Sequence, residues 1–217
     1  MLQSNQKSIG IQNNRNKNIS SDIVFISQNV QKIAIAHAVV FFFVIFAEYN
    51  MWRSVFGPDN KFWRWEWNIL SSENSQRLTD PYVFTHFLHG LLFFGIIFLF
   101  TSRFKINTSF YKKMYIVLAI ESIWEILENS PWIIDRYRQT VSLWYTGDSI
   151  LNSCFDIVAM TIGFCFAYRF PSRLSIMVFV TIEIVLWYMI RDNLILNIIM
   201  LLHPFQIIKT RQLSLGL

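Results

Sequence analysis

The chain has 217 residues, of which 53% are hydrophobic, 17% aromatic and only 15% charged, with a mean hydropathy of +0.36. These values exclude an ordinary soluble domain and are typical of a protein that crosses a membrane several times. The net charge of +5 should record orientation in the bilayer, and no feature of the composition favours a nucleic-acid partner.

Residues 1–30 are rich in Asn, Ser and Gln and lack sustained apolar periodicity, which predicts a mobile polar tail. The remainder, residues 31–217, is expected to form a single transmembrane helical domain. Five apolar stretches have the length of about 20 residues that a bilayer core requires. They cover approximately residues 33–51, 82–101, 113–130, 149–168 and 174–190.

A last apolar stretch, residues 194–205, is too short to cross the bilayer comfortably. The predicted fold is therefore an all-α integral membrane protein, a bundle of five transmembrane helices with a short C-terminal re-entrant or interfacial helix. Six full spans are the alternative. Between the third and fourth helices we expect a short polar connector rich in Trp, Tyr and Arg.

The loops predict the orientation. Basic residues without an acid join the second and third predicted helices, and further basic residues follow the fourth helix, which marks these loops and the N-terminus as cytoplasmic. The opposite loop, residues 52–81, balances its charges and carries tryptophans, as is typical of a membrane interface. The basic residues are Arg103, Lys105, Lys112, Lys113, Arg169 and Arg173; the tryptophans are Trp52, Trp63, Trp65 and Trp67.

Three of the predicted helices carry polar stripes at matching depth in the outer half of the membrane, given a rise of about 1.5 Å per residue. A charge near the bilayer centre costs on the order of 3 kcal/mol, so these groups should face a shared chamber and not lipid. The stripes are Glu121, Glu125 and Glu128; Asp148, Asn152 and Asp156; and His86 with His89.

The chemistry of these groups stays open. Carboxylates of this kind can act as general bases or as oxygen ligands of a metal, and the catalytic candidates are Glu125, Glu128, Asp156, Asn152 and Asp148. A mixed set of His and carboxylate suits Zn, Mn or Fe, with His86, His89 and Glu121 as candidate ligands of a divalent metal. The absence of an HExxH or paired ExxH motif leaves the ligand geometry unspecified. Hydrogen-bonded packing histidines are the alternative.

The arginines near the outer surface also have two interpretations. They could hold an anionic headgroup in forked geometry, or they could form an ion-pair network that joins helix ends to the carboxylates. The substrate-binding candidates are Arg136, Arg138, Arg191 and Asp192. Glu183, in the middle of the fifth predicted helix, requires a buried partner or a raised pKa. Three helical glycines, Gly90, Gly95 and Gly163, indicate close helix contacts.

Several stretches resemble a known family. WEILENSPWIIDRYR, GDSILNSCFD and IRDNLILNIIMLLHP, with SENSQ and HFLHG upstream, are similar to a family of uncharacterised bacterial multi-pass inner-membrane proteins, catalogued as a domain of unknown function. The likeness covers about residues 60–205 and implies a bacterial cell-membrane location without an established activity. The order of a histidine helix, an acidic helix and a D-x-x-x-N-x-x-x-D helix also resembles VanZ-like membrane proteins, which are linked to glycopeptide resistance.

These observations favour a membrane-embedded enzyme or binding protein whose chamber opens to the outer leaflet and takes a lipid-linked or amphiphilic substrate. One alternative is a proton- or ion-coupled transporter that uses the C-terminal helix as a re-entrant gate. The other is a non-catalytic assembly subunit in which the charges only fix helix register.

Overall fold

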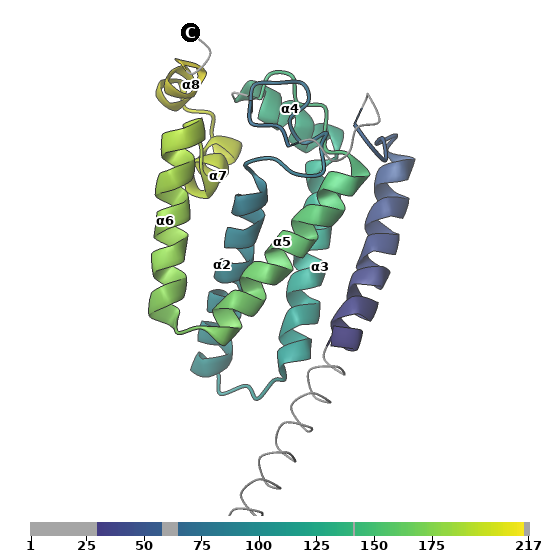
Figure 1. The fold of residues 1–217 in the computed structure, drawn as a ribbon, viewed down its shortest axis with the longest axis vertical. Helices are drawn as coiled ribbons and strands as arrows, with labels where there is room; N and C mark the ends of the chain where they lie inside the picture. Colours follow the sequence, from purple (N-terminus) through teal and green to yellow (C-terminus); the bar gives the residue numbers. More distant parts are fainter. Residues whose placement is uncertain (1–29, 58–64, 141, 215–217) are drawn as a thin grey trace, which may run out of the picture. The chain divides into compact units, whose positions relative to one another are not determined.

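A computed structural model describes residues 30–57, 65–140 and 142–214 of the chain (Figure 1). The predicted polar tail, apart from Val30, lies outside these residues, as do Trp63 and its neighbours. The chain divides into two compact units, Met1–Val39 and Val40–Leu217, and all of the labelled helices belong to the second. The long helices are the first, Val30–Asn50, and α2 (Val83–Arg103), α3 (Phe110–Glu128), α5 (Ile150–Arg169) and α6 (Ser172–Ile190); the short ones are α4 (Pro131–Gln139), α7 (Leu194–Leu202) and α8 (Gln206–Leu213).

The described residues form no β-strand, and the all-α membrane fold is confirmed. Within the described ranges, four helices are long and apolar enough to cross a membrane: the first helix, α2, α5 and α6. Helix α3 has 19 residues but carries two lysines and three glutamates, so its crossing stays a prediction. All five long helices begin and end within about one turn of the predicted positions.

Local capping explains where the helices begin. The hydroxyl of Ser149 accepts the backbone N–H of Asn152 at the start of α5, and the side chain of Asn193 accepts that of Leu196 at the start of α7. Such caps satisfy N–H groups that the first helical turn leaves unpaired.

The predicted polar connector between α3 and α5 contains a helix, α4, and that expectation was therefore incomplete. Ser130 accepts the N–H of Ile133 as N-cap, and Pro131 occupies the first helical position, where it needs no hydrogen bond. Helix α8 was also not predicted. Both helices are short and polar, so neither produces the long apolar stretch by which spans are recognised.

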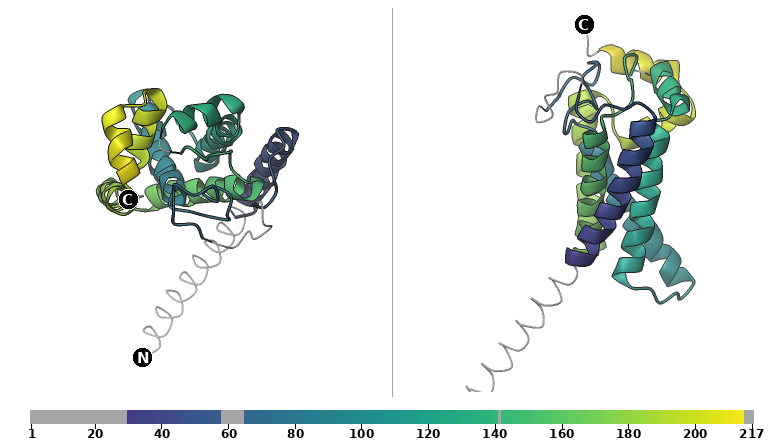
Figure 2. Two further views of the ribbon diagram at one scale, coloured as in Figure 1. Left: turned by 90° about the horizontal axis from the view of Figure 1, so that it is seen from above. Right: turned by 90° about the vertical axis from the view of Figure 1, so that its right-hand side faces the viewer.

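Helix α5 crosses α2 obliquely, as Figures 1 and 2 show, and two glycines permit the close approach. A Cβ atom added to Gly90 would lie 2.0 Å from the carbonyl oxygen of Met160, and one added to Gly163 would lie 2.0 Å from that of Phe87. Gly95 has open space around it. The predicted glycine contacts are thus present at Gly90 and Gly163 but not at Gly95.

Helix α7 is anchored at its N-terminus by Glu183 of α6. The two carboxylate oxygens accept the backbone N–H groups of Leu194, at 3.0 Å, and Ile195, at 3.2 Å, which gives Glu183 the buried partner that the sequence required. At about 1.5 Å per residue, the nine residues of α7 extend only about 14 Å, less than half of a bilayer core. Its length agrees with a short C-terminal helix and not with a sixth span.

The glycine contact leads to a matched pair of substitutions. We expect Gly163→Ala to destabilise the protein by about 1–3 kcal/mol, because the new methyl group would meet the backbone of α2. Gly95→Ala adds the same atom into open space and should leave stability unchanged or slightly higher. Thermal unfolding of the purified proteins in detergent measures both, and equal midpoints would show that α2 and α5 do not touch at this point.

Candidate functional site

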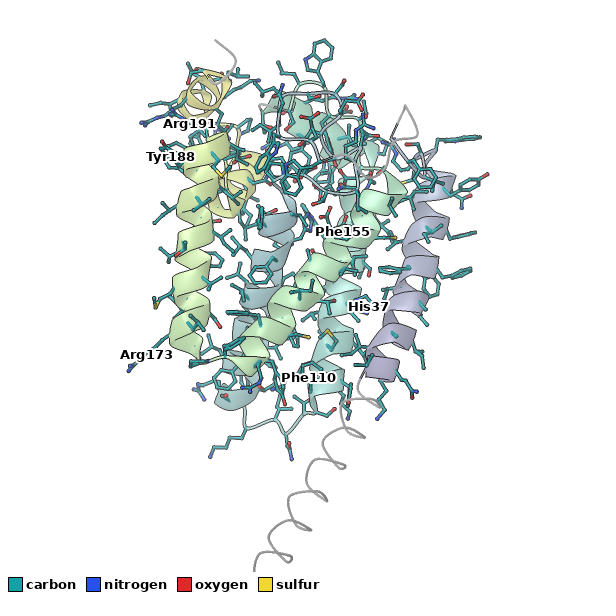
Figure 3. The ribbon with its side chains drawn as sticks, viewed as in Figure 1. His37, Phe110, Phe155, Arg173, Tyr188 and Arg191 are labelled. Carbon is teal, nitrogen blue, oxygen red and sulfur yellow. The ribbon has the colours of Figure 1, made fainter. Side chains whose placement is uncertain are left out.

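The site is a polar cavity of about 60 Å³ enclosed by α2, α3, α4, α5 and α7. Figure 3 shows oxygen and nitrogen atoms concentrated at the end of the bundle that carries α4, beyond the level of Phe155. A cavity of this size accommodates a few water molecules or a small polar group, but not a lipid chain. Its polar lining includes Tyr82, His86, His89, Glu128, Tyr137, Tyr145, Asp148, Asp156 and Asn197, and its apolar lining includes Trp124, Leu194, Ile198 and Leu201.

Glu121 of α3 holds both histidines of α2. Its Oε1 atom lies 2.8 Å from Nδ1 of His86 and 3.0 Å from Nδ1 of His89, and its side chain is completely buried. The two imidazole rings meet edge to face, with centroids 5.1 Å apart. Since each ring is fixed through Nδ1, its orientation is set by one carboxylate, as is common around functional histidines.

Glu125, one turn further along α3, is the most unusual side chain of the site. It is completely buried, and neither of its carboxylate oxygens has a hydrogen-bond partner among the described residues. Its nearest charged neighbour is His86, whose Nδ1 atom lies 3.3 Å from Oε1. Buried carboxylates are normally hydrogen-bonded, so an unsatisfied one marks a position that packing alone does not explain.

Asp156 of α5 approaches the same imidazole from the opposite side. Its Oδ2 atom lies 3.9 Å from Nε2 of His86, and its Oδ1 atom is buried without a hydrogen-bond partner in the described part of the chain. Asp156 lines the cavity together with Glu128. His86 is therefore the point at which acids from α3 and α5 converge.

The ion pairs described for these acids involve imidazoles and not arginines. Across residues 30–57, 65–140 and 142–214, the pairs made by Glu121, Glu125 and Asp156 all go to His86 or His89. This arrangement does not fit the alternative in which arginines neutralise the carboxylates and fix helix register. The acids therefore outnumber the imidazoles with which they pair in the described part of the chain.

The arginines predicted to bind substrate have other partners. The guanidinium of Arg136 donates to the carbonyl oxygens of Leu201, at 2.6 Å, and Leu202 at the end of α7. Arg138 donates to the carbonyl of Tyr145 and lies 3.4 Å from Asp135. Neither arginine lines the cavity, because both side chains are directed to backbone carbonyl groups.

The remaining predicted residues take structural positions beside the cavity. Arg191 ends α6 in the left-handed conformation, with φ of 57°. Asp192 accepts the Tyr82 hydroxyl at 2.9 Å. Asn152 is buried next to the cavity lining, with its amide nitrogen unpaired among the described residues.

Sequence reasoning missed Asn129, the residue that joins the first helix, α3 and α5 at the end of the bundle that carries α4. Its amide nitrogen lies 3.2 Å from both Glu48 of the first helix and Ser153 of α5, and its amide oxygen accepts the N–H of Asp148 at 2.6 Å. Asn129 follows Glu125 by four residues, so the helical period that grouped the glutamates also pointed to it. The hydroxyl of Tyr145 completes this network by donating to Asp148 at 2.9 Å.

Burial raises the pKa of the carboxyl groups that surround the cavity outside the spans. The pKa of Asp148 rises to about 7, although the hydrogen bond from Tyr145 opposes this rise. Burial likewise raises the pKa of Asp192 to about 7 and that of Asp80 to about 6. Loss of hydration disfavours the charged form of each acid, so this end of the protein should titrate near neutrality.

Comparison with known proteins agrees with the sequence motifs. Residues 48–214 match a family model described as "Protein of unknown function (DUF2585)". The chain is 45% identical over 169 residues to a UPF0314 protein of Rhizobium etli, which covers 77% of this chain and 85% of the relative. It is 48% identical over 149 residues to a UPF0314 protein of Rhizobium johnstonii, covering 68% of this chain and 74% of that one.

A UPF0314 protein of Paracoccus denitrificans is 42% identical over 152 residues, which are 70% of this chain and 77% of the relative. No solved structure matches the chain. The resemblance to an uncharacterised bacterial family is confirmed, whereas the resemblance to VanZ-like proteins stays a prediction.

The raised pKa of Asp148 predicts a pH dependence of stability. Folding raises this pKa from its ordinary 3.8 to about 7, so the folded protein binds the proton more tightly than the unfolded chain. The stabilisation is complete below the unfolded value and is lost as the pH rises to the folded value. We expect the midpoint of thermal unfolding in detergent to fall from pH 4 to pH 7 and then to level.

In Asp148→Asn, the unfolding midpoint should fall less between pH 4 and pH 7. The remaining decrease should come from Asp80 and Asp192. Asp135→Asn, at an exposed carboxylate of α4, is the matched control and should follow the wild-type profile. If the Asp148→Asn profile coincides with that of the wild type, Asp148 does not titrate in this range.

Proposed function

Since this chain belongs to the DUF2585 family, whose description names no reaction, we propose its function from the cavity described above. The protein is a multi-pass protein of the bacterial inner membrane that binds and chemically processes a lipid-linked or amphiphilic substrate. Its five long helices cross the membrane, and the cavity receives the polar end of the substrate.

The observation that carries this proposal is the buried carboxylate of Glu125, which has no hydrogen-bond partner among the described residues and lies beside His86. A buried acid that contacts an imidazole oriented by a second acid can accept or deliver a proton. Glu121 orients the ring, Glu125 lies 3.3 Å from Nδ1, and Asp156 lies 3.9 Å from Nε2. Proton transfer to or from a substrate through His86, which lines the cavity and contacts both acids, is the chemistry that this set supports best.

The shape of the cavity supports an amphiphilic substrate. Its interior admits only a small polar group, whereas α7 and Trp124 supply an apolar side. The hydroxyl groups of Tyr82, Tyr137 and Tyr145 already donate to Asp192, Asn197 and Asp148, so their oxygens are left to accept hydrogen bonds from a headgroup. Arg136 and Arg138 bind backbone carbonyls and do not line the cavity, so the headgroup would be bound without these two arginines.

The distribution of basic residues supports an opening to the outer leaflet. Arg103, Lys112 and Arg173 lie at the termini of α2, α3 and α6, at the end of the bundle opposite α4, where Figure 3 labels Arg173. Basic loops are characteristic of the cytoplasmic side. We therefore place the N-terminus in the cytoplasm and the cavity beneath the periplasmic surface.

Transport is the weaker alternative because the polar groups do not continue through the bundle. Further from α4, the fully buried side chains described for α3 and α5 are Met114, Val117, Leu118, Ile157, Met160 and Phe164. They form an apolar barrier where an ion-coupled carrier would need polar groups. The assembly-subunit alternative expects each carboxylate to have an arginine partner, which the described ion pairs do not provide.

Lipid analysis tests the proposal without a guessed substrate. We expect deletion of the gene in its host to change the abundance of a lipid or lipid-linked species, and expression of the wild-type protein to restore it. Glu125→Gln keeps the shape of the side chain and removes its basicity. Loss of a general base lowers rates by about 100-fold or more, so this variant should fail to restore the species while present in the membrane at normal abundance.

Asp135→Asn is the matched control and should restore the wild-type lipid profile. An unchanged profile in the deletion strain, or full restoration by Glu125→Gln, would contradict the proposed reaction.

A further inference from the structure

The acids around His86 outnumber the described cationic groups that could neutralise them. Four acids, Glu121, Glu125, Glu128 and Asp156, surround two imidazoles, and their described ion pairs include no lysine or arginine. With all four acids ionised, two negative charges would remain in excess even if both imidazoles were protonated. Uncompensated buried charge is strongly destabilising, and a bound cation is one way in which proteins remove it.

The donor atoms form two groups that share His86, and the ligand atoms within each group lie within 4.8 Å of one another. One group is His86, His89 and Glu121, and the other is His86, Glu125 and Glu128. The Nδ1 atom of His86 lies 2.8 Å from Glu121 and 3.3 Å from Glu125, and the Nδ1 atom of His89 lies 3.0 Å from Glu121. Metal bonds to His nitrogen and carboxylate oxygen are about 2.0–2.2 Å long, so ligands at right or tetrahedral angles lie about 2.9–3.5 Å apart.

Glu125 provides the independent indication of a ligand. Both of its oxygens are buried and lack hydrogen bonds within the described residues, although its neighbour Glu121 contacts both histidines. Neither packing nor helix register explains a buried carboxylate without hydrogen bonds at this position. Coordination to a cation would satisfy it, as it would the unpaired Oδ1 atom of Asp156.

We propose that a divalent transition-metal ion binds between these two groups, beside the cavity, with His86, His89, Glu121 and Glu125 as its ligands. Glu128, which lies within ligand distance of His86 and Glu125, is placed to complete the coordination. Two imidazoles with carboxylates suit Zn²⁺, Mn²⁺ or Fe²⁺ better than Ca²⁺ or Mg²⁺, which prefer oxygen ligands.

This inference deepens the proposed function, since the ion would lie beside the same cavity. A bound ion would polarise an oxygen of the headgroup or lower the pKa of a coordinated water. Asp156, on the other side of His86, would then remain free to exchange a proton with the substrate.

Metal binding by the purified full-length protein in detergent tests the site directly. After dialysis against a chelator, Zn²⁺ and Mn²⁺ are titrated separately, and bound metal and thermal unfolding are measured. We expect close to one ion per chain, with a dissociation constant below about 1 µM for the preferred metal. We also expect the unfolding midpoint to rise with metal concentration.

Two variants that remove single ligands make the test specific. Glu125→Gln and His89→Gln should each weaken binding at least tenfold and lose the metal-dependent rise in the midpoint. Without metal, Glu125→Gln should be at least as stable as the wild type, because it replaces a buried acid that has no hydrogen bond with a neutral side chain. His89→Gln tests metal binding at a second proposed ligand, whose side chain is only partly buried. Asp135→Asn, on the exposed face of α4, should bind metal as the wild type does.

The absence of saturable binding of either ion by the wild type would overturn the inference. Metal binding by both ligand variants with the same affinity as the wild type would also overturn it. The outcome is separable from that of the lipid test. Metal binding without a lipid change would contradict the reaction alone, and a lipid change without metal binding would contradict the metal site alone.

Discussion

The contact of one carboxylate with two imidazoles organises this protein. Glu121 fixes both histidines of α2 from α3, and the two glycine contacts press α5 onto α2, which brings Asp156 to the far side of His86. Polar groups from three helices therefore meet in an environment where water is scarce and electrostatic interactions are strong. The rest of the α4 end, including Asn129 and the tyrosines, positions and covers this meeting point.

The sequence was sufficient to predict the long helices and the level along them at which the polar groups of α2, α3 and α5 meet. Both are local properties: about 20 apolar residues define a span, and the constant rise of a helix converts residue number into depth. The convergence of Glu125, His86 and Asp156 followed because a membrane penalises polar side chains that face lipid. No comparable rule operates on the short helices, and α4 and α8 were consequently missed.

The arginines show where such reasoning stops. Arg136 and Arg138 stand next to a predicted acidic chamber, and charge alone suggested that they would serve it. Arg136 instead binds carbonyls of α7, more than sixty residues away in the chain. Long flexible side chains can reach several acceptors, and the acceptor they bind depends on tertiary packing that no local pattern records. Asn129 was overlooked for the converse reason, since a neutral amide at a helix end looks like an ordinary cap.

Helix α7 is held by charge at both of its ends. Glu183 of α6 binds the amides of its first turn, and Arg136 of α4 binds the carbonyls of its last. The negative charge lies at the N-terminus and the positive charge at the C-terminus of α7, where each interacts favourably with the helix dipole. Because both of its ends are held, α7 should be a rigid part of the cavity lining and not a mobile lid. The cavity should therefore discriminate among ligands by its preformed size. It should not close around the ligand that binds.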